Sequence, residues 1–180
     1  GDAEAVPVLL RRIAANALLN VEVLRPIRIP RSKLVKDVEV GRVVQLAAKF
    51  TGPDDAILIV FDADGDCPAE LGRRLIAAAQ RARSDRAVAV VLAEQEFEAW
   101  FLAAVPSLVA CGKLPAGTQQ PSDPESVRDA KGWLGRAMGR RYSETIDQPA
   151  FAALFDWSSA RAASSLDKFV RDVLRLIAVR

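Results

Sequence analysis

Three groups of acidic residues could carry chemistry in this sequence. The densest is Asp62-Ala-Asp64-Gly-Asp66, which follows the apolar run Ala56–Phe61. Alternation along an extended chain aims Asp62 and Asp64 the same way, and carboxylates that close repel each other unless a cation or a proton lies between them. The alternative is a helix-capping turn before Pro68 with solvated aspartates, but three acids in five residues exceed what a cap needs. The spacing therefore predicts a divalent-cation site.

The second group is Glu94-Gln-Glu96-Phe-Glu98-Ala-Trp100, directly after the apolar run Ala87–Ala93. We expect a helix over residues 94–104, on which Glu94 and Glu98 share one face and Glu96 points into solvent. The alternative is a helix N-terminus whose acids favour the helix dipole. Glu4 is the third element, at the start of the first predicted helix.

Composition narrows the chemistry further. The chain has 180 residues, 25 Lys+Arg, 23 Asp+Glu and no histidine, and its two cysteines are Cys67 and Cys111. The absence of histidine excludes Ser-His-Asp and Cys-His nucleophiles and every metal site that needs an imidazole. Clustered carboxylates without imidazole indicate a hard, oxygen-preferring cation, Mg²⁺ or Mn²⁺.

The order of the elements predicts how these acids are positioned. Short apolar runs at 56–61 and 87–92 are typical of strands covered on both faces, and helical spacing lies between and around them. This alternation predicts a mostly parallel α/β sheet flanked by helices. Acids that follow two parallel strands then open on one edge of that sheet. The helices expected by residue spacing cover 4–20, 36–50, 69–83, 94–104, 126–138, 148–155 and 166–178, with an irregular or edge strand at 21–29.

We expect residues 1–105 to form the α/β domain and residues 106–180 a loop and helical C-terminal extension packed on it. The loop is Pro106–Pro124, rich in Gly, Pro, Ser, Thr and Gln. The order of elements lacks an opening strand, so we expect the first strand to be missing from the sequence. No apolar run approaches the roughly 20 residues of a membrane helix, so we expect no membrane and a cytoplasmic location.

The acidic run shares features with two known loop patterns but departs from both. A calcium-binding EF-hand needs Gly at position six and Glu at twelve, where this chain has Cys67 and Arg73. Haloacid-dehalogenase-like phosphatases also carry a strand followed by Asp-x-Asp, but they need Thr or Val where Asp66 stands and a later acidic pair at a strand end. That family remains the alternative for a phosphatase.

The ordered set Gly1-Asp-Ala-Glu4, Phe61-Asp-Ala-Asp64 and Glu94-x-x-x-Glu98-Ala-Trp100 resembles a Toprim domain. More narrowly, it resembles a family of small bacterial Toprim-like proteins, the domain of unknown function 4276 family, related to the overcoming-lysogenization-defect (OLD) nucleases. Lys131-Gly-Trp133-Leu and Ser165-Leu-Asp-Lys-Phe169 also suit that family, so the resemblance spans nearly the whole chain.

The resemblance implies a two-metal nuclease acting on DNA or RNA. Glu4, Asp62 and Asp64 match the expected catalytic positions, and the expected metal ligands are Glu4, Asp62, Asp64, Asp66, Glu94 and Glu98. The strand-ending Glu of the Toprim pattern would lie one residue before Gly1. Two divalent cations about 4 Å apart would stabilise the attacking and leaving oxygens at phosphorus.

A polyanionic substrate also needs positive charge beside the acids. Arg73 and Arg74 follow the acidic run, and Arg140 and Arg141 lie in the helical extension, so these four are the expected nucleic-acid contacts; solvated helix faces are the alternative. The resemblance also suggests a role in phage defence with a partner ATPase. The alternative of a different class is a non-catalytic Toprim-like subunit that regulates such an ATPase.

Overall fold

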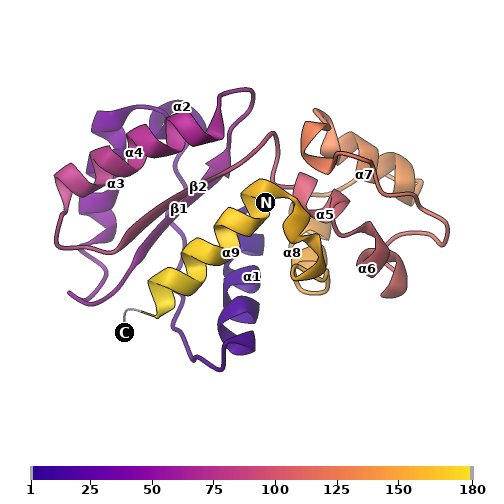
Figure 1. The fold of residues 1–180 in the computed structure, drawn as a ribbon, viewed down its shortest axis with the longest axis horizontal. Coiled ribbons are helices and arrows are strands. Elements are labelled where there is room, and N and C mark those ends of the chain that lie inside the picture. The colour runs from indigo at the N-terminus through magenta and orange to yellow at the C-terminus, as the bar shows by residue number, and fades with distance from the viewer. Residues whose placement is uncertain (1, 179–180) are drawn as a thin grey trace.

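The computed structural model describes residues 2–178, and its centre is a two-stranded parallel sheet (Figure 1). Strand β1 (Ile57–Asp62) pairs with β2 (Val88–Ala93) in a register that sets Ile57 opposite Val88 and Asp62 opposite Ala93. Helix α4 (Pro68–Ala82) connects them, as a parallel pair requires. The predicted strands and connecting helix are thus confirmed to within one residue at each end.

Helices cover both faces of this sheet, which is why the strands are almost wholly apolar. The first face packs against α4, α3 (Asp37–Ala47) and the short α2 (Arg31–Leu34), and alternate β1 residues Ile57, Ile59 and Phe61 are buried there. The second face packs against α1 (Asp2–Asn16) and α9 (Ser164–Ile177). The parallel α/β arrangement flanked by helices is therefore confirmed, although the sheet within residues 2–178 has only two strands.

The remaining elements form a helical lobe beside the sheet (Figure 1). The lobe contains α5 (Ala99–Leu102), α6 (Val105–Ala110), η1 (Pro124–Ser126), α7 (Ala130–Met138), α8 (Asp147–Ala152) and η2 (Ser159–Ala162). One hydrophobic cluster runs from Ala5 on α1 through Trp100 to Val173 on α9, so the lobe shares its core with the second face of the sheet.

Three predictions of local structure were wrong. Residues 94–98 are not helical; the chain bends there, and a helix begins only at Ala99. The predicted loop 106–124 contains most of α6, because Val105 and Leu108 are buried in the core. Residues 21–29 form no strand, in keeping with Pro26 within that segment. No helix within residues 2–178 is long and apolar enough to cross a membrane.

Candidate acidic site

Asp62 is the last residue of β1 and stands beside the end of β2. The N–H of the next residue, Ala63, donates to the carbonyl of Ala93 (2.8 Å), so the two strands end at the same edge of the sheet. After β2 the chain bends back, and the backbone N–H of Phe97 donates to Oδ1 of Asp62 (2.8 Å). The bend at 94–98 therefore places the second acidic group against the first.

Arg31 holds the turn that follows Asp62. Its Nε donates to the carbonyl of Asp62 (3.0 Å), and its Nη2 donates to the carbonyl of Ala63 and to a carboxylate oxygen of Asp66. Asp64 adopts a left-handed conformation with φ 50°, and both Asp64 and Asp66 are exposed. The turn thus directs the last two aspartates of the run outward, whereas Asp62 stays half-buried.

Glu98 is the most unusual acid in the molecule. Its side chain has no exposed surface, and neither carboxylate oxygen accepts a hydrogen bond of good geometry within residues 2–178, although the Tyr142 hydroxyl, which also lacks such a bond, lies close enough to interact with Glu98. The nearest counter-charge is Nζ of Lys131, 4.0 Å from Oε2, and the same Nζ lies 3.2 Å from Oε1 of the exposed Glu144. A buried carboxylate normally accepts hydrogen bonds from several donors. Because Glu98 lacks them, its charge is left to be neutralised by a proton or by a bound ligand.

Burial raises the affinity of both Asp62 and Glu98 for protons. Burial raises the pKa of Asp62 to about 7, and the charge of Asp2 raises it further, against the lowering effects of the Phe97 N–H and Lys131. Burial raises the pKa of Glu98 to about 8; Lys131 opposes this, and the charges of Asp62 and Asp2 add to it. We call Asp62 and Glu98 the acidic pair. Such displaced carboxyl pKa values are typical of functional sites.

Residues from several other elements surround the acidic pair. Asp2 accepts a hydrogen bond from Nε2 of the buried Gln148 (2.6 Å), and Glu96 accepts one from the backbone N–H of Lys131 (3.3 Å). Burial and then the charge of Glu98 raise the pKa of Tyr142 well above its usual value. Apart from Lys131 in its family segment, the sequence signalled none of these roles, because helix folding brings them in from distant positions. Glu96 is half-buried rather than pointing into solvent.

The other predicted ligands lie apart from the acidic pair or are already engaged. Glu4 is exposed and pairs with Arg28, and Asp66 pairs with Arg31. Glu94 is half-buried, and its pKa is raised by burial and then by the charges of Glu125 and Asp123. Because residues 94–98 bend, Glu94 and Glu98 do not share a helix face.

The four predicted nucleic-acid contacts fall on two separate surfaces. Arg73 and Arg74 belong to α4, where Arg74 pairs with Asp37 (3.1 Å) and donates to the carbonyl of Val35. Arg140 and Arg141 follow α7, and the ribbon shows α4 and α7 at opposite ends of the molecule (Figure 1). These arginines therefore cannot all contact one short stretch of substrate.

The donor set can be tested against a divalent cation. The unpartnered oxygens of Glu98 and the raised pKa of Asp62 fit a cation that would replace the protons. Within residues 2–178, however, no three Asp, Glu or Cys side chains are grouped tightly enough to form a complete set of protein ligands. The acidic pair therefore fits a hydrated cation of the Mg²⁺ type, which keeps several waters and takes only one or two carboxylates.

Comparison with known proteins gives one result. A family model described as "Domain of unknown function (DUF4276)" matches residues 1–174, nearly the whole chain. No curated protein matches the chain, and neither does any solved structure.

Proposed function

The chain belongs to the DUF4276 family, and we propose that it is a divalent-metal-dependent phosphoryl-transfer enzyme, a nuclease of the Toprim/OLD type. The observation that carries this proposal is the acidic pair: a strand-end aspartate next to a fully buried glutamate with two unpartnered oxygens. Glu98 stands at the N-cap position of α5, but its side chain makes no capping hydrogen bond, and its ion pair with Lys131 is long, at 4.0 Å.

The acidic pair would hold Mg²⁺ or Mn²⁺. When bound there, the cation supplies Lewis-acid stabilisation of phosphoryl oxygens. The chain's own contribution is to hold Asp62 through the N–H of Phe97 and to keep Glu98 out of water. Exclusion of water strengthens each charge interaction at the site. Glu4, Asp64 and Asp66 remain candidate ligands, but Glu4 and Asp66 would first have to leave Arg28 and Arg31.

Lys131 supplies the positive charge that the protein holds next to the acidic pair. Glu98 and then Glu144 raise its pKa, so its ammonium stays charged over the whole neutral range. Its Nζ lies between the buried Glu98 and the exposed Glu144. A cation at the acidic pair would balance the negative charge of Glu98 in place of Lys131. The ammonium of Lys131 would then be available on the solvent-facing side.

The test is metal-dependent nicking of plasmid DNA by the purified protein, with an RNA substrate in parallel. We expect cleavage with Mg²⁺ or Mn²⁺ that is lost in EDTA and in Glu98→Gln. The matched control is Glu144→Gln, which removes the exposed carboxylate on the other side of Lys131. Equal activity of the wild type and Glu98→Gln would overturn the proposal.

The same experiment separates the alternatives. Stable binding to a partner ATPase, with no cleavage of any nucleic acid, would identify a non-catalytic regulatory subunit. Hydrolysis of a generic phosphate ester, with an aspartyl-phosphate trapped at Asp62, would identify a haloacid-dehalogenase-like phosphatase. In that case the hydrogen bond from Phe97 to Asp62 would orient a nucleophile instead of a ligand.

A further inference from the structure

A cavity of about 420 Å³ lies at the C-terminal end of α7, in the helical lobe and away from the sheet edge. Its volume is within the range of small-ligand sites. Its walls combine apolar and charged side chains, among them Lys113, Leu114, Met138, Arg140, Asp147 and Phe151. We call it the anion cavity, because Lys113 and Arg140 line it.

Arg140 is held rigidly at this cavity by a buried carboxylate. Its two terminal nitrogens donate to the two oxygens of Asp147 (2.8 and 2.6 Å), and Asp147 is only 4% exposed. The N–H of Ser143 donates to Asp147 as well (2.8 Å), and the hydrogen bond from Arg140 lowers the pKa of Asp147. Arg140 itself stays 56% exposed. It also donates to the carbonyl of Arg141 (3.1 Å), so the guanidinium is pre-oriented while the side chain stays open to solvent, an arrangement that suits a phosphate.

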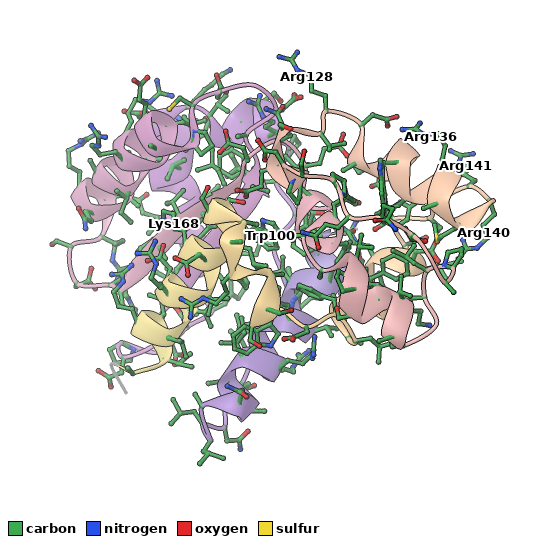
Figure 2. All side chains as sticks on the ribbon, turned by 45° about the vertical axis from the view of Figure 1, so that its right-hand side comes forward. Trp100, Arg128, Arg136, Arg140, Arg141 and Lys168 are labelled. Atoms are coloured by element: carbon green, nitrogen blue, oxygen red, sulfur yellow. The ribbon has the colours of Figure 1, made fainter. Side chains whose placement is uncertain are left out.

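Further positive charge surrounds Arg140. Lys113 lines the cavity, is exposed and acts on Asp147 through its charge. Figure 2 shows Arg136 and Arg141 extending from the same end of α7, with Arg128 further along the same lobe. Arg136 pairs with Asp129, whereas Arg128 and Arg141 form no ion pair within residues 2–178. Asp147 is the one carboxylate lining the cavity in the described part of the chain.

Tyr142 connects the anion cavity with the acidic pair. The ring of Tyr142 contacts Phe151, a cavity residue, at 6.1 Å between centroids. The charge of Glu98 also acts on Tyr142 and raises the pKa of its hydroxyl. A ligand in the cavity would thus lie in the same lobe as the buried acid, with the Tyr142–Phe151 contact connecting them.

We propose that the anion cavity binds a backbone phosphate of a nucleic acid through Arg140 and Lys113, the apolar wall contacting the adjacent sugar or base. The proposal rests on the proposed function for its choice of polymer, because a free nucleotide offers the same phosphate. It places the substrate on the lobe rather than on α4, where Arg73 and Arg74 lie.

The test measures binding without cleavage. A fluorescent single-stranded oligonucleotide and the matching duplex are titrated with the full chain in EDTA, at several salt concentrations. Lys113→Gln combined with Arg140→Gln is expected to weaken binding about tenfold at low salt, and to make the plot of log K against log salt shallower by about one to two. The control is Arg42→Gln on α3 combined with Lys49→Gln just after that helix, which removes the same charges from exposed positions elsewhere.

Arg140→Gln leaves Asp147 without its partner and could unfold the lobe, so Lys113→Glu is measured alone as well. The side chain of Lys113 is exposed and makes no hydrogen bond or ion pair within the described residues, and it acts on Asp147 only through its charge. Its charge reversal should therefore weaken binding and lower the thermal midpoint only slightly. Unchanged affinity and salt slope in both variants, or no binding by the wild type, would overturn the proposal. So would displacement of the oligonucleotide by micromolar mononucleotide, which would assign the cavity to a free nucleotide.

Failure of the nuclease proposal can be distinguished from failure of the proposal for the anion cavity. If the oligonucleotide binds through Lys113 and Arg140 but no divalent cation supports cleavage, the nuclease proposal fails and the anion cavity stands. If cleavage depends on Glu98 but not on the cavity residues, the nuclease proposal stands and the proposal for the anion cavity fails.

Discussion

Five of the six predicted metal ligands fall into two classes. Asp62, which is half-buried, and Glu98, which is fully buried, lie at the sheet edge, and their pKa values are raised to about 7 and about 8. Glu4, Asp64 and Asp66, which we call the exposed acids, lie in solvent, and two of them are paired with arginines. Asp62 and Asp66 are four residues apart in one turn, so position in the sequence does not set these differences.

What separates the two classes is the protein around each carboxyl. Water solvates the charge of an exposed acid, and an arginine at the surface balances it at little gain in stability. A buried acid keeps its proton until something else neutralises the charge. The acidic pair is therefore primed to exchange protons for a cation, whereas the exposed acids have no such reason to bind one tightly.

The largest effect should come from removing one member of the acidic pair. Asp62→Asn or Glu98→Gln should lower metal-dependent cleavage by more than the roughly 10–100-fold typical of losing a residue that only supports a metal ligand. Asp66→Asn should lower it much less. Plasmid nicking measured for the three variants at equal concentration checks this, and equal losses in all three would remove the distinction between the classes.

Metal binding should depend strongly on pH. A cation needs ionised carboxylates, so its affinity should rise by about tenfold or more between about pH 6 and about pH 8.5, as the acidic pair loses its protons. Titration calorimetry with Mn²⁺ at both pH values measures the change, together with the protons released. An affinity independent of pH would mean that the exposed acids, and not the acidic pair, hold the metal.

Stability without metal should show the burial of Glu98 directly. Its folded pKa, about 8, lies above the ordinary value of 4.5, so its contribution to stability is fully present below 4.5 and is lost as pH rises through about 8. In EDTA, Glu98→Gln should match the wild type near pH 5 and be more stable by roughly 2–4 kcal/mol near pH 8.5. Urea unfolding measures both free energies. Glu144→Gln, the exposed counterpart, should show no such divergence.

The smallest effects belong to the arginines that pair with the exposed acids. Arg31 is partly buried and donates to two carbonyls, so Arg31→Ala should lower the free energy of unfolding by about 1–3 kcal/mol. Arg28→Ala breaks only an exposed ion pair with Glu4 and should leave thermal unfolding unchanged. If the two variants behave alike, the Asp62–Asp66 turn is not held by Arg31.

The local pattern was enough to predict the elements with strong signals. Continuous apolar runs gave β1 and β2, and helical spacing with Pro68 at its start gave α4. The same pattern failed at 94–98, where acids and aromatics at helical spacing suggested a helix. There the burial of Phe97 and Glu98 and the bond from Phe97 to Asp62 fix a bent backbone instead.

The candidate site was predicted in part. The strand ends led to Asp62, and the Ala-Trp context led to Glu98. What the sequence could not show is that Glu98 is buried without partners, or that Lys131, Tyr142 and Asp2 act on it. These relationships depend on how α1 and the helical lobe pack on the sheet, which no local spacing encodes.

Trp100 is an intrinsic fluorescent probe of the candidate site. It follows Glu98 by two residues, is fully buried, and donates its indole N–H to Oγ of Ser165 (2.7 Å). Its ring is tilted against that of Phe97, with 4.5 Å between the centroids, and the N–H of Phe97 donates to Asp62. Trp133 and Trp157 are partly exposed and could be replaced by Phe. The chain thus carries its own fluorophore beside the acidic pair, and the emission of a single-tryptophan variant would follow occupancy of the pair in real time without any label.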